Sequence, residues 1–160
     1  MHTISIRPLL AETEAEACAA FMAASEPWLT LRRGPAACLH LLQDPSRECY
    51  AARVDDRLAG VLVLNLHGAF VGYLQTLCVA PDFRGRGVGS ALIAFAEARI
   101  FRDHPNVFLC VSAFNHAAQR LYQRLGYVVI GELADYVVAG QSELLLRKSR
   151  GPLDRAPEGG

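Results

Sequence analysis

The sequence predicts one α/β domain of the α+β type, with about four helices flanking a mixed sheet of six or seven strands. Two observations support this. The chain has 160 residues, 52% of them hydrophobic and 20% charged, which suits one folded domain. The predicted element order, β-α-α-β-β-β-α-β-α-β-β, mixes hairpins with two helical connections, and such an order gives a sheet with parallel and antiparallel pairs.

The first elements are a strand and two helices. Residues 4–9 alternate apolar and polar side chains, which predicts a strand. Thr13 and Glu16 have the spacing of a capping box, which predicts that a helix begins at this point. A second helix is predicted over residues 35–43, because Pro35 suits a first helical turn.

The middle of the chain reads as an antiparallel meander followed by a helix and a buried strand. Residues 48–54, 58–66 and 70–79 are strand-like and are separated by short turns. A helix then runs to about Phe101. Residues 107–112 are almost entirely apolar, which predicts a strand buried on both faces.

The last elements are one helix and two strands. Asn115 is a suitable N-cap for a helix over residues 116–125, and Gly126 suits the position just beyond the helix end. Residues 127–131 and 143–146 are the last predicted strands. The domain is therefore expected to span residues 1–148. The remainder, 149–160, is rich in Pro, Gly and charge and is expected to be a disordered tail.

Composition argues against several partners. The formal net charge is zero, so no overall positive field attracts nucleic acid or an anionic membrane. No signal peptide is visible, and the apolar stretch 58–80 is interrupted by polar residues and glycines. The five cysteines form no C-x-x-C pair, which predicts reduced thiols in a cytoplasmic protein without a metal site or disulfide framework.

A glycine-rich turn is the most informative segment. It joins a predicted strand to a predicted helix, so backbone N–H groups converge at the positive end of the helix dipole, where an anion such as phosphate binds well. Its two arginines add donors that suit phosphate oxygens. The predicted phosphate-binding residues are Arg84, Gly85, Arg86, Gly87, Val88, Gly89 and Ser90.

Three kinds of phosphate site compete for this turn. A nucleotide P-loop would end in Gly-Lys-Ser/Thr, and no lysine stands before Ser90. A dinucleotide site would need G-x-G-x-x-G and an acidic residue about 20 positions later, and neither is present. The acyl-CoA pyrophosphate turn, with Arg or Gln, two residues, Gly, one residue and Gly, fits residues 84–89.

At this point the chain resembles the GCN5-related N-acetyltransferase superfamily. Residues 79–92 are similar to its central motif, and residues 115–127 are similar to a second motif. The resemblance covers roughly residues 4–148. It implies a sheet with a splayed strand pair that admits the cofactor, here residues 70–79 and 107–112.

The resemblance implies an acetyl-CoA-dependent N-acetyltransferase without a metal. A primary amine attacks the thioester directly through a tetrahedral intermediate. Backbone groups of Leu77, Cys78 and Val79 are expected to bind the pantetheine arm and the developing oxyanion. Asn115 is expected to contact the cofactor arm, and Tyr122, two helical turns further on, to protonate the departing thiolate.

The general base is less evident. Related ribosomal-protein acetyltransferases carry a Glu in the fifth strand, where this chain has Cys110. A water relay held by polar residues is the preferred reading, and carboxylates or an imidazole from loops and helix ends are alternatives. The candidates are Tyr73, Gln75 and Ser112 for the relay, and Glu26, Glu132 and His116 for the alternatives.

The acceptor is expected to be an amine of a small molecule or a peptide N-terminus, without nucleic acid or membrane. Trp28, Phe70, Tyr73 and Gln75 are the predicted substrate-binding residues, and Tyr136 is expected to close the pocket. The aromatic members suit an apolar or cationic group. The fold often pairs through its last strands, which leaves a homodimer open.

Two other functions remain open. A non-catalytic acyl-CoA-binding module that senses or regulates would explain the missing base. A nucleotide-binding domain is disfavoured by the absent lysine and acidic partner.

Overall fold

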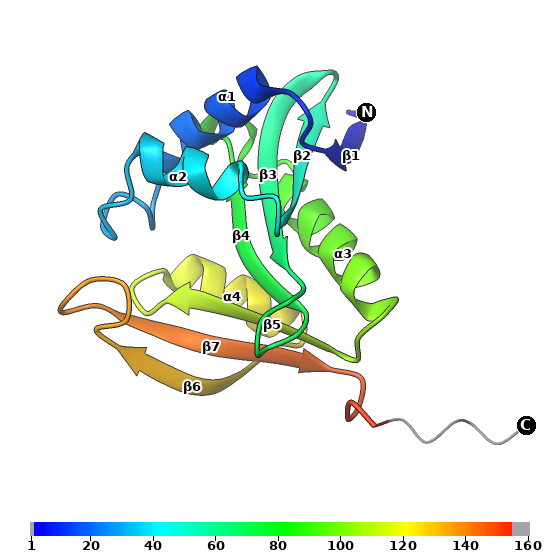
Figure 1. Cartoon of the computed structure of the whole chain (residues 1–160), viewed down its shortest axis with the longest axis vertical. Coiled ribbons are helices and arrows are strands. Elements are labelled where there is room, and N and C mark those ends of the chain that lie inside the picture. The colour runs from blue at the N-terminus through cyan, green and yellow to red at the C-terminus, as the bar shows by residue number, and fades with distance from the viewer. Residues whose placement is uncertain (1, 155–160) are drawn as a thin grey trace, which may run out of the picture.

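Seven strands form one sheet in the order β1-β2-β3-β4-β5-β7-β6 within residues 2–154, the part of the chain that this computed structural model describes (Figure 1). Strands β4 and β5 pair in parallel, whereas the other neighbours pair antiparallel. The predicted mixed sheet is therefore confirmed. The strands are β1 (Ile4–Pro8), β2 (Glu48–Val54), β3 (Arg57–Asn65), β4 (Tyr73–Val79), β5 (Asn106–Ser112), β6 (Val128–Ala134) and β7 (Ser142–Ser149).

Helices cover both faces of the sheet. Strand β3 shows how: Val61 and Val63 pack in the cluster with α1 and α2, and Leu62 and Leu64 pack on the other side with α3. Successive strand residues point to opposite faces, so an uninterrupted apolar strand is buried between two helical layers. The helices in the described part are α1 (Glu12–Ala23), α2 (Pro35–Leu42), α3 (Val88–Phe101) and α4 (His116–Arg124), with a 3-10 turn at Pro81–Phe83.

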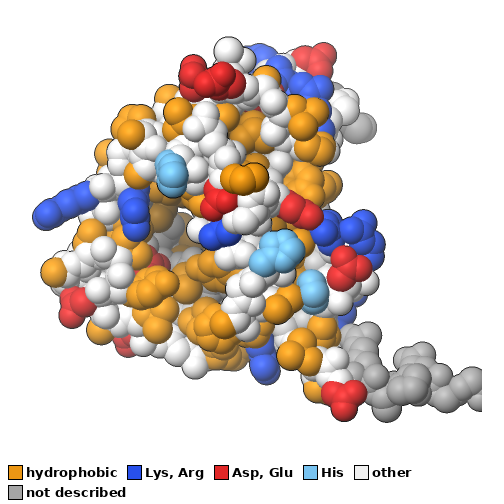
Figure 2. Space-filling view, in the orientation of Figure 1, with side chains coloured by type: hydrophobic (Ala, Val, Ile, Leu, Met, Phe, Trp, Pro, Cys, Tyr) orange, Lys and Arg blue, Asp and Glu red, His pale blue; other side chains and the backbone are white. Residues whose placement is uncertain are grey.

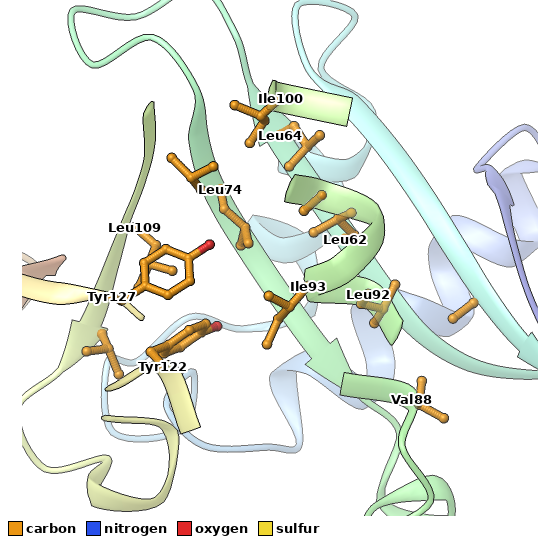
Figure 3. Packing of buried hydrophobic residues seen from close by; sticks show 14 of the residues in the cluster. Leu62, Leu64, Leu74, Val88, Leu92, Ile93, Ile100, Leu109, Tyr122 and Tyr127 are labelled. Atoms are coloured by element: carbon orange, nitrogen blue, oxygen red, sulfur yellow. The ribbon is translucent and has the colours of Figure 1, made fainter. Parts of the chain in front are cut away.

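The larger core lies between the sheet and the pair α3 and α4 (Figure 3). Leu62, Ile93, Ile100 and Leu109 are fully or almost fully buried there. Each such side chain stabilises the fold by about 1.5–3 kcal/mol through its removal from water. Residues of β4, β5 and α4 all belong to this core, so it connects these three elements.

Some expected boundaries are wrong. Helix α1 begins at Glu12 with Ala11 as N-cap, so Thr13 lies inside the helix and cannot form the predicted capping box. Strand β4 begins at Tyr73 rather than residue 70. Strand β7 extends to Ser149 rather than ending at residue 146, because it pairs with β5 along that strand's whole length. Residues 155–160 of the predicted tail lie outside the described part.

Candidate active site

The central strands β4 and β5 separate after a short contact. They pair only at Tyr73 with Phe108 and at Leu74 with Leu109. Just beyond that contact, Gln75 is an extra residue in β4, because Val63 and Leu64 of β3 face Thr76 and Leu74. Such a bulge changes the direction of a strand. The bulge therefore coincides with the start of a gap between β4 and β5.

A cleft of about 260 Å³ occupies this gap. Figure 2 shows the surface hollowed between the upper part of the view, where α1 and α2 lie, and the lower part, where β5, β6 and β7 lie. Strand β4 contributes residues 73–77 and β5 contributes residues 109–112. The other walls come from the loop after α1, from α4 and from the loop between β6 and β7.

The glycine turn leads from the end of β4 into α3. Gly85 and Gly87 have φ angles of +73° and +81°, which side chains other than glycine rarely adopt. The first helical hydrogen bond of α3 runs from the N–H of Ala91 to the carbonyl of Gly87. The N–H groups of Val88, Gly89 and Ser90 consequently have no partner within the helix and suit a phosphate at its N-terminus.

The two arginines of this turn differ in their contacts. Arg84 donates from Nη2 to Ser25 Oγ at 2.9 Å and from Nε to the Val79 carbonyl at 3.4 Å. The guanidinium carbon of Arg86 lies 5.5 Å from the ring centre of Phe83. Both arginine side chains are exposed at the turn. Both belong to the turn that precedes the N–H groups of α3.

Every second backbone N–H group of β4 points into the gap between β4 and β5. The N–H of Ala80 donates to Ala59 at the start of β3 at 2.8 Å. Because successive N–H groups of a strand point to opposite sides, those of Val79 and Leu77 point away from β3 and that of Cys78 points toward it. Leu77 lines the cleft, whereas Cys78 packs under α1 and α2.

Helix α4 supplies the residues predicted from the second motif. Asn115 caps the helix, because its side-chain oxygen accepts from the N–H of Ala118 at 3.3 Å. Tyr122 is buried beside Tyr127 (Figure 3) and lines the cleft together with Asn115. Burial raises the pKa of the Tyr122 phenol to about 12, because a tyrosinate would lose its hydration. Tyr122 therefore holds its proton at neutral pH.

The opposite wall of the cleft carries a buried carboxylate. Glu143 of β7 lies directly across from Ser112 of β5, whose hydroxyl donates to Glu143 Oε1 at 2.8 Å. Burial raises the pKa of the Glu143 carboxyl, and the Ser112 hydrogen bond opposes that rise. Tyr73 and Cys110 also line the cleft, and burial raises the pKa of both groups.

The predicted substrate-binding residues fall into two groups. Trp28, Tyr73 and Gln75 line the cleft, and so does Tyr136. Gln75 is held by Arg47, whose Nε donates to its side-chain oxygen at 2.7 Å. Phe70 does not line the cleft; its ring is half-exposed and lies 5.2 Å from that of Phe108.

Glu143 is a buried cleft residue that is not among the residues predicted from the sequence. Of the candidates for the base, Tyr73, Gln75 and Ser112 line the cleft, and Glu26, Glu132 and His116 do not. The available signal was a single acidic residue at the start of an otherwise apolar run, Ser-Glu-Leu-Leu-Leu, at residues 142–146. A lone charge in such a run indicates a specific partner or a site, because burying a charge is costly.

Two further properties bear on the expected chemistry. Among the described residues, no group of three or more His, Cys, Asp or Glu side chains is arranged to hold a metal ion. No helix in that part of the chain is both long and apolar enough to cross a membrane. The cleft combines strand N–H groups, a protonated tyrosine and a buried carboxylate, and β4 leads from the cleft to the glycine turn.

Comparison with known families gives one clear match. The family model described as "Acetyltransferase (GNAT) family" matches residues 10–127, which include β4, the glycine turn and α4.

Curated relatives carry related names. The chain is 33% identical over 99 residues to blasticidin-S acetyltransferase of Streptomyces morookaense, covering 62% of this chain and 72% of that protein. It is 30% identical over 110 residues to an uncharacterized N-acetyltransferase of Methanocaldococcus jannaschii, covering 65% and 70%. It is 31% identical over 104 residues to N-alpha-acetyltransferase 30 of Xenopus laevis, covering 62% of this chain and 38% of that protein.

Solved structures share the fold. The ribosomal-protein-S18-alanine N-acetyltransferase of Escherichia coli aligns with a TM-score of 0.72 and 19% identity, covering 99% of this chain and 97% of that chain. An aminoglycoside 6'-N-acetyltransferase complexed with coenzyme A aligns with a TM-score of 0.71 and 16% identity, covering 94% and 99%. At these identities the likeness establishes the architecture alone.

Proposed function

The chain belongs to the acetyltransferase (GNAT) family, and on that premise we propose that it transfers the acetyl group of acetyl-CoA to a primary amine of a small molecule or of a peptide N-terminus. The family and the names of its relatives make it an acyltransferase that uses acetyl-CoA. The proposal adds the class of acceptor and the residues that carry out the transfer.

One observation carries the proposal. The cleft between the separated ends of β4 and β5 has Tyr122 on one wall and Glu143 on another, and β4 leads directly into the glycine turn. Acetyl-CoA, when bound, supplies a thioester whose carbonyl carbon accepts the amine. The turn and the gap suit its pyrophosphate and its extended arm, so the residues present fit this co-substrate.

Different residues of the chain bind different parts of acetyl-CoA, the acetyl donor. The N–H groups at the start of α3 and the arginines of the turn hold phosphate oxygens. The N–H of Leu77, which points into the gap, is the donor for the negative charge that develops on the carbonyl oxygen. Asn115 offers its side-chain NH₂ to the cofactor arm while its oxygen caps α4. Tyr122 provides the proton for the departing sulfur.

The acceptor side supports a primary amine. Trp28, Tyr73 and Tyr136 line the cleft with the carboxylate of Glu143. Aromatic faces and a carboxylate both favour a cationic group such as an ammonium. The names of two relatives, blasticidin-S acetyltransferase and N-alpha-acetyltransferase 30, support a small molecule and an N-terminal amine respectively.

The alternative of a non-catalytic acyl-CoA-binding module was motivated by the absence of a base from the usual strand position. A buried carboxylate in the cleft weakens that motive, because it offers a proton acceptor from a different strand. We therefore favour the enzyme.

Calorimetry and a thiol-release assay test the proposal. Acetyl-CoA is expected to bind at micromolar to low millimolar concentration, and at least one amine in a panel of aryl-alkyl amines and short free-N-terminal peptides is expected to release CoA thiol. No binding at millimolar acetyl-CoA would contradict the proposal. Tight binding with no release across the panel would instead favour the non-catalytic module.

A further inference from the structure

We propose that Glu143 takes the proton from the acceptor's primary ammonium, and that Ser112 positions it for this task. The inference rests on the proposed function and identifies the group that replaces the missing base. It also defines the acceptor more narrowly, as a primary amine that enters the cleft as an ammonium between aromatic side chains.

The position of Glu143 is the first support. Its side chain is 5% exposed and lines the cleft, and no other carboxylate of the described residues does so. Residues that face each other across an antiparallel pair share one side of the sheet. Glu143 faces Ser112 in this way. Because alternate residues of β5 share a face, Cys110 lies on the same side, opposite the face on which Leu109 and Val111 pack with the α3 and α4 core.

The carboxylate also has room for a ligand. Oε1 accepts the Ser112 hydroxyl, and within residues 2–154 no other protein donor to this carboxylate is found. Its titratable neighbours on β4 and β5 are Tyr73 and Cys110, whose raised pKa values keep them neutral at pH 7, and Tyr136 of the β6–β7 loop also lines the cleft. A buried carboxylate without a cationic partner attracts an ammonium strongly, because there is little water to screen it.

The other polar groups of the cleft are less suited to accept the proton. Gln75 has no basic site and is held by Arg47. Tyr73 and Cys110 carry protons at neutral pH, since burial raises the pKa of each. Ser112 already directs its hydroxyl proton toward Glu143. Glu143 is the one acidic group among the described residues that line the cleft, and its carboxylate has oxygen lone pairs that can take up a proton.

The acetyl transfer moves protons through Glu143 and Tyr122. Glu143 accepts one proton from the ammonium and releases it to solvent through the open cleft, which leaves a neutral amine. The nitrogen lone pair forms the new C–N bond, the C–S bond breaks, and the sulfur keeps its electron pair and takes the proton of Tyr122. The nitrogen then gives its surplus proton to Glu143, which releases it to solvent, and Tyr122 regains a proton from solvent. The net products are an amide, a thiol and one released proton.

The test compares Glu143→Gln with the wild type and with Glu16→Gln, a matched change at an exposed residue of α1. The probes are 2-phenylethylamine and a tetrapeptide with a free N-terminus, each with acetyl-CoA at saturation. Because a general base contributes roughly 10²–10⁴-fold, Glu143→Gln is expected to lower kcat at pH 7 at least 100-fold, whereas Glu16→Gln leaves it unchanged. The Glu143→Gln rate should then rise tenfold per pH unit as solvent deprotonates the amine.

Ser112→Ala separates positioning from a purely structural role. The Ser112 hydrogen bond stabilises the ionised carboxylate, so its loss should raise the pKa of Glu143 further. The acid limb of kcat/KM is then expected to move to higher pH, with full activity recovered above it. A uniform loss of activity with an unmoved acid limb would overturn the role of Ser112.

A binding measurement completes the design. Calorimetry of 2-phenylethylamine against the protein saturated with CoA should give an affinity that falls at least tenfold in Glu143→Gln. If the wild type transfers acetyl groups and kcat of Glu143→Gln is within threefold of the wild-type kcat, the inference is overturned while the proposed function stands. If wild type neither binds acetyl-CoA nor releases thiol, the proposed function fails. If no amine binds the CoA complex more tightly in wild type than in Glu143→Gln, the inference fails on its own.

Discussion

Arg84 and Ser25 join the glycine turn to the end of α1. Arg84 Nη2 donates to Ser25 Oγ at 2.9 Å, and the Ser25 hydroxyl donates to the Phe21 carbonyl at 2.6 Å. Ser25 is buried, and the chain continues from it into the loop that carries Trp28. One arginine thus links the side of the cleft expected to bind the donor with the side expected to bind the acceptor.

Replacing Arg84 by Ala is expected to weaken coenzyme A binding about tenfold or more, because a hydrogen bond to a charged group contributes about 1.5–3 kcal/mol. Isothermal titration of CoA measures the effect. Arg102→Ala, at the opposite end of α3 where the side chain is largely exposed, is the matched control and should bind like wild type. Equal affinities of the two variants would remove Arg84 from the phosphate site.

The structural features that could be predicted from the sequence are those set by residues adjacent to one another along the chain. The glycine turn is encoded by Gly85 and Gly87, which adopt positive φ angles as the pattern requires. Asn115 and Gly126 mark the ends of α4 as predicted. In both cases the residue type and the local backbone conformation are linked directly, so spacing along the chain is sufficient information.

Replacing Gly87 by Ala should destabilise the fold without any steric clash. A Cβ at this position would meet no atom within 4 Å, so the cost is that of a left-handed backbone, about 1–2 kcal/mol. Gly34, with φ of −76° and equally open space, is the matched control, and Gly34→Ala should change the free energy of unfolding little. Urea titrations with and without CoA compare them, and equal stabilities would contradict the role of the φ angle.

Features that depend on distant segments were not predictable in the same way. The bulge at Gln75 arises from the pairing of β4 with β3, and the gap arises because β5 leaves β4 after two residue pairs. Glu143 and Ser112 are 31 positions apart in the sequence and are hydrogen-bonded across the β5–β7 pair. No local sequence pattern specifies the register of that pair. Local patterns therefore predict a water relay on β4 and β5, or a base from a loop or helix end, whereas this carboxylate lies on β7.

The buried thiols should depend on folding for their reactivity. Burial raises the pKa of Cys18 and Cys78 to about 12. Since the thiolate is the reactive form, neither should react with Ellman's reagent at pH 8 until the protein is unfolded by guanidinium. Half-buried Cys49 and Cys110 are expected to react more readily. Fast reaction of all five thiols in the native protein would contradict the packing of α1 against β4.

The same shifts predict loss of stability in alkali. A thiol whose folded pKa lies above its unfolded value favours the native state fully below the unfolded value, near pH 8.5–9, and this contribution is lost as pH rises toward the folded value. The free energy of unfolding should therefore fall between pH 9 and 11. Urea titrations at pH 7, 9 and 10.5 measure this, and a stability that is constant or rises over this range would show that the thiols are not buried in protonated form.

Tyr122→Phe is expected to lower kcat at least tenfold while the affinity for acetyl-CoA stays within about twofold, because the change removes one proton donor and no cofactor contact. Since the pKa of Tyr122 is raised to about 12, wild-type kcat should not decline between pH 8 and 10 through ionisation of this group.

Tyr127→Phe is the matched control: its ring packs 5.5 Å from that of Tyr122, but its hydroxyl donates to Glu97 at 3.0 Å and lies outside the cleft. It should lose about 1 kcal/mol of stability and keep its kcat. Stopped-flow thiol release and urea titrations on both variants decide the matter, and an unchanged kcat in Tyr122→Phe would exclude it as the proton donor.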